Sequence, residues 1–265
     1  MTAMKNKVYE MYFSPTGGTR SSGKIFTSQL CSSLEAVPVA VDLLSAVRSG
    51  AELPEFREGD ICVISVPSFA GRVPLPAVEV LSKAKGNGAR AVLNVVYGNR
   101  AIDDTLLELR DILSKAGFRC AAAMETVAEH SIFRQFAAGR PDEEDQVELK
   151  DFAQKTAEVL KKKTDAEDCL KVPGNNPYRE RKPVSTIPEG NDRCSGCGLC
   201  AKECPVHAIS KDNPKATDSQ LCFGCMRCVS LCPESARDIA DLLREKMLSH
   251  MTQVCGGRKE NRLYL

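Results

Sequence analysis

The stretch 8-VYEMYFSPTGGTR-20 runs from an apolar segment through a glycine-rich loop into the start of a helix. We predict a strand over 8–14 and a helix from about Arg20. Backbone N–H groups freed at the glycines and at the helix start, together with nearby hydroxyls, suit a phosphate monoester without a basic side chain. The residues of this predicted phosphate loop are Ser14, Thr16, Gly17, Gly18 and Thr19.

Two other interpretations of this loop compete with phosphate binding. One is a glycine turn that binds no phosphate. The other is an NTP-binding P-loop, because residues 18–24 spell G-x-x-x-x-G-K. Ile25 stands at the next position, where such a loop carries the Ser or Thr that holds magnesium, and this mismatch disfavours the P-loop.

Beyond the loop, short apolar runs alternate with amphipathic stretches as far as about Lys163. That alternation predicts an α/β fold, a mostly parallel sheet with helices on both faces. The last helix is predicted to begin at Pro141, with acidic residues 142–145 and lysines 161–163 complementing the helix dipole. Four further strands are predicted at 37–42, 61–66, 91–97 and 119–127.

The chain has 265 residues, more than the 100–150 or so of one typical compact domain, so we expect two unequal units. Its 36 Lys and Arg balance 35 Asp and Glu, so a net charge of +1 provides no basic field for nucleic acid. Residues 1–7 contain no apolar signal segment. No apolar run approaches the roughly 20 residues of a membrane helix, and we expect a cytoplasmic protein.

Thirteen cysteines are the unusual feature of the composition. An odd number without a signal segment indicates a reducing compartment rather than a secreted disulfide scaffold. Eight of them form C-x2-C-x2-C-x3-C-P twice, starting at Cys194 and at Cys222. Structural zinc is the alternative, but a four-ligand zinc site has no use for the middle cysteine of each triplet. His207 lies three residues after Cys204, the last cysteine of the first repeat. We expect it to be a bystander rather than a metal ligand.

In this motif, three cysteines bind one cubane cluster and the fourth, before the proline, binds the other cluster. We therefore expect two [4Fe-4S] clusters with crossed ligands, and residues 191–237 closely resemble bacterial two-cluster ferredoxins. The first cluster is assigned to Cys194, Cys197, Cys200 and Cys232. The second cluster is assigned to Cys222, Cys225, Cys228 and Cys204.

The order S-x-T-G-G-T at the end of the first strand resembles the FMN phosphate loop of flavodoxins, and residues 4–163 resemble that domain as a whole. The resemblance implies a doubly wound, five-stranded parallel sheet in the order 2-1-3-4-5, with FMN outside the carboxyl ends of the strands. The complete chain is similar to the flavodoxin–ferredoxin fusion family of anaerobic bacteria and archaea. The expected units are 1–163 for FMN, 164–190 as linker, 191–237 for the clusters, and 238–265 as helix and tail.

The linker and the C-terminal unit follow from local patterns. Prolines 173, 177, 183 and 188 interrupt regular structure in the expected linker. Beyond the cysteines, apolar residues at 236, 239, 243 and 247 predict an amphipathic helix over 233–250. The tail after Met251 gives no signal.

Two loops are expected to face the flavin ring, after the third and fourth strands. Each pairs an aromatic side chain with a glycine, which lets a planar ring stack on one and approach bare backbone at the other. The chain has no tryptophan, the residue that stacks on the ring in many flavodoxins, so Phe69 and Tyr97 would replace it. Arg72 and Arg100 would stabilise an anionic reduced flavin, with a surface ion pair as the equal alternative. The residues of these loops are Ser68, Phe69, Ala70, Gly71, Arg72, Tyr97, Gly98, Asn99 and Arg100.

The combination implies an electron-transfer iron–sulfur flavoprotein, with a ferredoxin or an oxidoreductase as its expected partner. One alternative is an FMN-dependent reductase of a small organic acceptor, with Tyr97 or His130 as the proton donor. We expect His130, beside Glu129, to be a solvated loop residue instead. The other alternative is a docking module of a larger redox complex. No G-x-G-x-x-G is present, so direct NAD(P)H binding has no support. Five cysteines have no motif partner: Cys31, Cys62, Cys120, Cys169 and Cys255.

Overall fold

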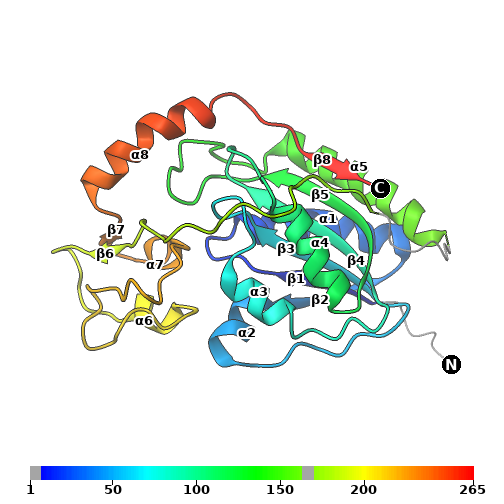
Figure 1. The fold of residues 1–265 in the computed structure, drawn as a ribbon, viewed down its shortest axis with the longest axis horizontal. Coiled ribbons are helices and arrows are strands. Elements are labelled where there is room, and N and C mark those ends of the chain that lie inside the picture. Colours follow the sequence, from blue (N-terminus) through cyan, green and yellow to red (C-terminus); the bar gives the residue numbers. More distant parts are fainter. Residues whose placement is uncertain (1–6, 163–169) are drawn as a thin grey trace.

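The computed structural model describes residues 7–162 and 170–265. Residues 1–6 and 163–169, which include Cys169 and the first part of the expected linker, lie outside the described residues. A large sheet with its helices forms one body, and a small cysteine-rich unit lies beside one edge of it (Figure 1).

The large sheet has the strand order β2-β1-β3-β4-β5-β8. Its first five strands pair in parallel, so the predicted α/β class and the order 2-1-3-4-5 are confirmed. The sixth strand pairs antiparallel with β5, and no pattern in the sequence predicted it. The strands are β1 Lys7–Tyr12, β2 Val37–Asp42, β3 Ile61–Pro67, β4 Arg90–Tyr97, β5 Arg119–Val127 and β8 Arg262–Tyr264.

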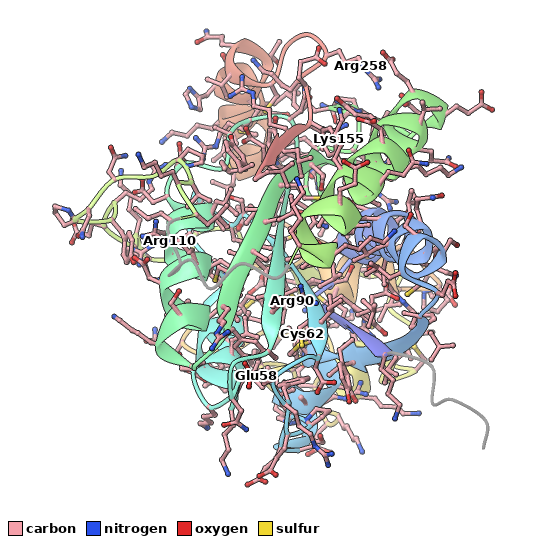
Figure 2. The ribbon with its side chains drawn as sticks, turned by 90° about the vertical axis from the view of Figure 1, so that its right-hand side faces the viewer. Glu58, Cys62, Arg90, Arg110, Lys155 and Arg258 are labelled. Atoms are coloured by element: carbon pink, nitrogen blue, oxygen red, sulfur yellow. The ribbon has the colours of Figure 1, made fainter. Side chains whose placement is uncertain are left out.

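Helices cover both faces of this sheet, as expected for buried parallel strands. Figure 2 shows α4, which carries Arg110, and α5, which carries Lys155, on opposite sides of the sheet. The helices α1 and α5 pack together on one face, and α2, α3 and α4 pack on the other. These helices are α1 Gly18–Leu34, α2 Leu43–Ser49, α3 Leu75–Leu81, α4 Thr105–Lys115 and α5 Glu143–Lys161.

The small unit is built around two short helices and a two-stranded antiparallel ladder. Each helix contains one cysteine of a predicted triplet, Cys200 in α6 and Cys228 in α7. The elements are β6 Glu189–Gly190, α6 Leu199–Glu203, α7 Arg227–Ser230 and β7 Arg237–Asp238.

The start of α5 differs from the prediction that placed Pro141 at the first helical position. Asp142 is the N-cap: its side chain accepts the N–H of Asp145 at 3.1 Å, and the Asp145 carboxylate accepts the N–H of Asp142 at 2.9 Å. Two carboxylates thus satisfy the free N–H groups of the first turn, so Pro141 lies one residue before the cap.

The C-terminal helix also begins later than predicted. Residues 237–238 pair with β6, and Ala236 and Ile239 are buried in the small unit, so α8 runs over Asp241–Val254 instead of 233–250. Its Met251 and the following Cys255 pack on Phe133, which follows β5. The tail then returns to the large sheet as β8. Among the described residues, no helix has both the length and the apolar character to cross a membrane.

The described part of the expected linker is extended but lies against the large unit. Leu170 is buried in the sheet core. Further along, the backbone N–H groups of Asn175 and Arg179 donate to the Asp104 carboxylate at 2.8 and 2.6 Å. Arg181 donates to Glu108 of α4 at 2.6 Å. These contacts fix the path of the chain toward the small unit.

Candidate functional site

The predicted phosphate loop connects β1 to α1 and leaves the start of α1 open. Gly17 is the N-cap, with φ of 97°, and has no side chain to cap the first turn. Ser14 Oγ accepts the N–H of Arg20 at 2.9 Å, which curls the loop over the helix start. The N-terminus of this 17-residue helix therefore presents free N–H groups and a partial positive charge, which favour an anion.

The P-loop alternative does not fit this geometry. Residues 18–24 lie in the first turns of α1 and form no loop. Gly23 is buried inside the helix, where an added Cβ would lie 2.6 Å from Ser65 Oγ. The second glycine of the G-x-x-x-x-G-K pattern is thus explained by close packing of α1 on β3.

The loop after β3 is a tight turn in which Phe69 and Arg72 exchange backbone hydrogen bonds of 3.1 Å. Ala70 and Gly71 take the positive φ angles that this turn requires, 51° and 79°. The Arg72 side chain points to α4 and makes two 2.8 Å hydrogen bonds with the Glu108 carboxylate. Burial raises the pKa of Glu108, but the hydrogen bonds from Arg72 and from the Val73 N–H outweigh it, and the net pKa is lowered.

Arg100 is likewise engaged, in an ion pair with Asp103. The structure therefore places both predicted arginines in ion pairs of the large unit, but the Arg72–Glu108 pair is largely buried instead of lying on the surface. Ser68, between these loops, shares a 2.8 Å hydrogen bond with Thr105 Oγ1 at the start of α4.

The loop after β4 is held by the tail that follows α8. Tyr97 is buried, and its hydroxyl donates to the carbonyl of Glu260 at 3.3 Å. Burial raises the pKa of Tyr97 to about 12. Asn99 donates to the carbonyls of Cys255 and Gly257 at 2.7 Å each. This contact between the tail and the loop had no signal in the sequence, because neither segment predicts its partner.

His130 is not the solvated loop residue that we expected. Its ring lies among Phe133 and Phe136, and its backbone packs against Gly98, where an added Cβ would lie 2.8 Å from the His130 Cα. Nδ1 accepts the N–H groups of Ile132 and Phe133 at 3.1 and 3.2 Å. Burial, and then Arg100, lowers the pKa of His130 to about 4, so the ring is neutral near pH 7.

The eight motif cysteines surround two separate cavities in the small unit. Each cavity takes three cysteines from one repeat and the last cysteine of the other repeat. The first cavity is lined by Cys194, Cys197, Cys200 and Cys232. The second cavity is lined by Cys204, Cys222, Cys225 and Cys228. These are the two sets assigned from the motif, brought together by the fold.

The thiols stand around each cavity instead of converging on one point. Among the described residues, no group of three or more Cys, His, Asp or Glu side chains is arranged to hold a single metal ion. Backbone N–H groups already point at the crossed cysteines, from Ala208 to Cys204 Sγ at 3.3 Å and from Ala236 to Cys232 Sγ at 3.2 Å. Such hydrogen bonds to sulfur tune the potential of a cluster. The donor set and the space fit a cubane cluster in each cavity.

Arg237 is a residue of this site that the sequence did not single out. It is 2% exposed, lines the first cavity, and its Nη1 lies 3.9 Å from Cys200 Sγ. Its guanidinium donates to the Pro188 carbonyl at 2.8 Å, to the Pro214 carbonyl and to Thr217. A buried positive charge next to thiolates offsets part of their negative charge. The position of Arg237 beside the cysteines is apparent only from the fold.

The small unit meets the carboxyl edge of the large sheet. Phe223, between Cys222 and Gly224, packs against Phe13 after β1 and Phe69 after β3. Beside this contact lies a cavity of about 410 Å³, lined on one side by Thr16, Gly18 and His130 and on the other by α7 and Cys232. The predicted phosphate loop and the cysteine cavities therefore border one junction. Of the cysteines outside the motifs, four are buried: Cys31, Cys62, Cys120 and Cys255.

Comparison with known proteins agrees with this division of the chain. Residues 193–237 match a 4Fe-4S dicluster domain family. An uncharacterized protein of Methanothermobacter thermautotrophicus is 29% identical over 177 residues, covering 62% of this chain and 38% of the relative. An uncharacterized ferredoxin of Methanocaldococcus jannaschii is 37% identical over 76 residues, covering 26% of this chain and 50% of the relative. The chain thus spans half or less of the length of these curated relatives.

Among solved structures, an archaeal flavodoxin is 14% identical with a TM-score of 0.40, covering 59% of this chain and 99% of its own. A flavodoxin of Streptococcus pneumoniae TIGR4 is 16% identical with a TM-score of 0.40, covering 57% and 98%. The flavodoxin-like character of the large unit rests on the strand order described above. The chain therefore joins a flavodoxin-like sheet and a 4Fe-4S dicluster domain in one polypeptide.

Proposed function

We propose that this chain is an electron-transfer iron–sulfur flavoprotein with two [4Fe-4S] clusters and one FMN. The observation that carries the proposal is the pair of four-cysteine cavities beside the edge of a flavodoxin-like sheet. FMN, when bound, exchanges one or two electrons, whereas each [4Fe-4S] cluster passes one at a time. The chain would then connect one-electron and two-electron redox partners, with a ferredoxin or an oxidoreductase as the protein partner, in a reducing compartment.

The residues of the large unit fit FMN in two respects. The start of α1, with Thr16 and the buried Thr19, supplies N–H and hydroxyl donors for the phosphate. Phe69 and Gly71 form a turn at the edge where flavodoxin-like sheets bind FMN, outside the carboxyl ends of the strands. Gly71 itself is buried against Asp103 and Arg179, so its backbone is not free for a flavin ring.

A reductase of a small organic acceptor is the second candidate, and the geometry gives it less support. Of the two proton donors considered for it, Tyr97 already donates to Glu260, and its pKa is raised to about 12 by burial. His130 lines the junction cavity, but its pKa is lowered to about 4 by burial, so it carries no extra proton near pH 7. Electron transfer requires no such donor from the protein.

The test is anaerobic purification followed by iron and flavin analysis and a redox titration monitored by absorbance and electron paramagnetic resonance (EPR). We expect about eight irons and one FMN per chain. The protein should exchange electrons with a range of one-electron mediators without saturation. Saturable turnover of one organic compound would favour the reductase instead. Absence of flavin, or iron content of one cluster, would contradict the proposal.

A further inference from the structure

The two cysteine cavities are not equivalent in their relation to the large sheet. Phe223 directly follows Cys222, which lines the second cavity. Its ring centroid lies 6.0 Å from that of Phe13 and 6.4 Å from that of Phe69. These two partners follow β1 and β3, the strands between whose ends flavodoxin-like sheets bind FMN. A single side chain thus connects a cysteine of the second cavity with the proposed flavin site.

Polar contacts between the units gather at the same cavity. Arg227, between Met226 and Cys228, donates to the carbonyl of Pro15 in the phosphate loop at 3.3 Å and to Glu203 at 2.7 Å. Glu203, which precedes Cys204, also accepts from Arg48 of α2 at 2.7 Å. These ion-paired side chains are between 21% and 32% exposed, so water screens them only partly.

The first cavity holds the one exposed cysteine among the eight of the motifs, Cys197. Cys200 of this cavity is 8% exposed, as are Cys204 and Cys225 of the second cavity. The polar neighbours of the first cavity pair within the small unit, as Arg193 does with the Ser235 carbonyl at 2.6 Å. Cys232 of the first set lines the junction cavity, and beside the second set this cavity is lined by Met226 and Val229 instead of a cysteine.

From these contacts we infer the order of the electron path, an inference that rests on the proposed function. Cys204, Cys222, Cys225 and Cys228 hold the flavin-side cluster, and Phe223 is the positioning residue between that cluster and the flavin. Cys194, Cys197, Cys200 and Cys232 hold the solvent-side cluster, which exchanges electrons with an external one-electron partner. Each electron leaves the donor, reduces the solvent-side cluster and passes to the flavin-side cluster, reoxidising the first. Two such passages, with protons taken from water, reduce the flavin fully.

The chain offers a matched pair of variants for the test. Phe223 and Leu221 flank the same ligand, Cys222, but Leu221 is 51% exposed and has no part in the aromatic contact. In fully loaded protein, Phe223→Ala should slow flavin reduction after rapid photoreduction of a small one-electron donor. The expected loss is severalfold, because removal of the ring takes away the packing that holds the second cavity beside the edge of the large sheet. Leu221→Ala should reduce its flavin at the wild-type rate.

A second measurement needs no electron-transfer rate. Removal of FMN from the wild-type protein should change the EPR spectrum of the reduced flavin-side cluster and leave that of the solvent-side cluster unchanged. The two spectra are identified by their loss in Cys225→Ser and in Cys197→Ser, one cysteine from each cavity. If Phe223→Ala loses cofactors, Arg227→Gln replaces it, with Arg193→Gln as its control beside the first cavity.

Wild-type rates in both Phe223→Ala and Arg227→Gln at full cofactor content would overturn the inferred order. So would an effect of FMN removal on the solvent-side spectrum instead of the flavin-side one. Failure of the proposed function would be recognised by a different result. In that case the wild-type protein itself would lack FMN or one cluster, whatever the variants show.

Discussion

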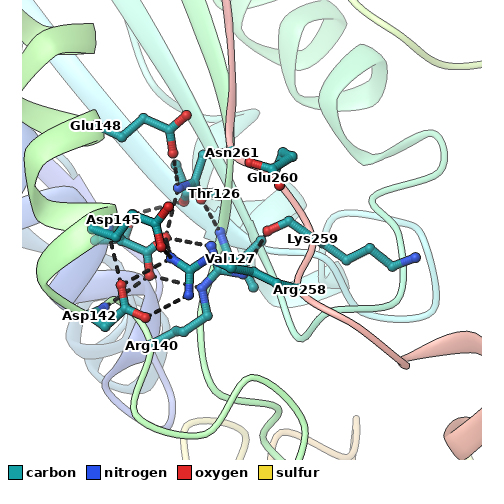
Figure 3. A network of polar contacts seen from close by, with 12 residues as sticks. Thr126, Val127, Arg140, Asp142, Asp145, Glu148, Arg258, Lys259, Glu260 and Asn261 are labelled. Atoms are coloured by element: carbon teal, nitrogen blue, oxygen red, sulfur yellow. Dashed lines mark hydrogen bonds and ion pairs between the residues drawn. The ribbon is translucent and has the colours of Figure 1, made fainter.

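Asn261, in the tail, donates its side-chain amide to the buried carboxylate of Asp145 at 2.9 Å and accepts the N–H of Val127 at 2.8 Å (Figure 3). The Asp145 carboxylate also accepts a 2.8 Å hydrogen bond from Arg140 Nε to its Oδ2. The side chains of Arg140 and Asp145 are 5% and 1% exposed. Burial alone would raise the pKa of Asp145, but the hydrogen bonds from Arg140 and its neighbours lower it overall. This network fastens the tail, and through it the loop after β4, to the large sheet.

Replacement of Asn261 should therefore destabilise the whole protein. In Asn261→Ala the buried N–H of Val127 loses its acceptor, which costs about 1–3 kcal/mol in the free energy of unfolding. Arg262→Ala is the matched control, because Arg262 is 69% exposed and its ion pair with Glu125 spans 3.5 Å. It should cost less than about 1 kcal/mol. Denaturant unfolding measures both, and equal losses in the two variants would contradict a special role of the network.

The crossed arrangement of the cysteines predicts that replacing a cysteine of the first repeat removes the cluster of the second. Cys204 belongs to the first repeat but lines the second cavity. Cys204→Ala should therefore remove the same EPR signal as Cys225→Ala and leave about four of eight irons. A loss of the signal that Cys197→Ala removes would show uncrossed ligands. Iron analysis with EPR of the reduced, anaerobically purified variants decides between these results.

Arg237 should raise the reduction potential of the clusters. Its buried guanidinium lies beside Cys200, and positive charge favours the more negative, reduced state of a cluster. Arg237→Gln should lower a cluster potential by about 60 mV, equivalent to a tenfold change for one electron. Arg237→Lys keeps the charge and should recover most of the shift. An EPR-monitored redox titration measures the potentials, and unchanged values in Arg237→Gln at full iron content would refute this role.

If the predicted phosphate loop binds FMN, loss of its hydroxyl groups should weaken FMN binding. Thr16→Val with Thr19→Val removes two hydroxyl donors while keeping the shape of the side chains. Two hydrogen bonds to a charged phosphate, at about 1.5 kcal/mol each, correspond to about a hundredfold in Kd. Thr252→Val is the control, because Thr252 is exposed on α8 and its hydroxyl donates to the Leu248 carbonyl. Fluorescence titration of flavin-depleted protein gives the Kd values; unaltered binding by the double variant would remove the phosphate site.

His130 predicts a loss of stability in acid. Burial lowers its pKa to about 4 from 6.5, so between these values the unfolded chain binds a proton that the folded protein does not. Its contribution is present in full above about pH 6.5 and is lost as the pH falls toward 4, by up to about 3 kcal/mol. Unfolding measured between pH 7 and pH 5 should show a weaker pH dependence in His130→Gln than in wild type. The exposed His250→Gln should keep the wild-type slope; identical slopes in all three proteins would contradict the assignment.

Local patterns sufficed for much of this molecule. The apolar runs became β1 to β5 within one or two residues, because strands buried on both faces need nearly continuous apolar sequence. The spacing of the eight cysteines was enough to assign two sets of four, since three ligands of each cavity lie within seven residues. Helix ends were less certain: the start of α5 depended on a capping box between Asp142 and Asp145, and that of α8 on the pairing of β7 with β6.

By itself the sequence predicted the chemistry of this protein, because the triplets of cysteines and the expected phosphate loop are short segments of fixed spacing. Only the tertiary structure decided which segments distant in the sequence contact one another. Pairing of β8 with β5, burial of Arg237 and packing of Phe223 on Phe13 join residues 20 or more positions apart. Such contacts are selected by the burial of apolar surface and the pairing of polar groups over the whole fold, and no local spacing encodes them.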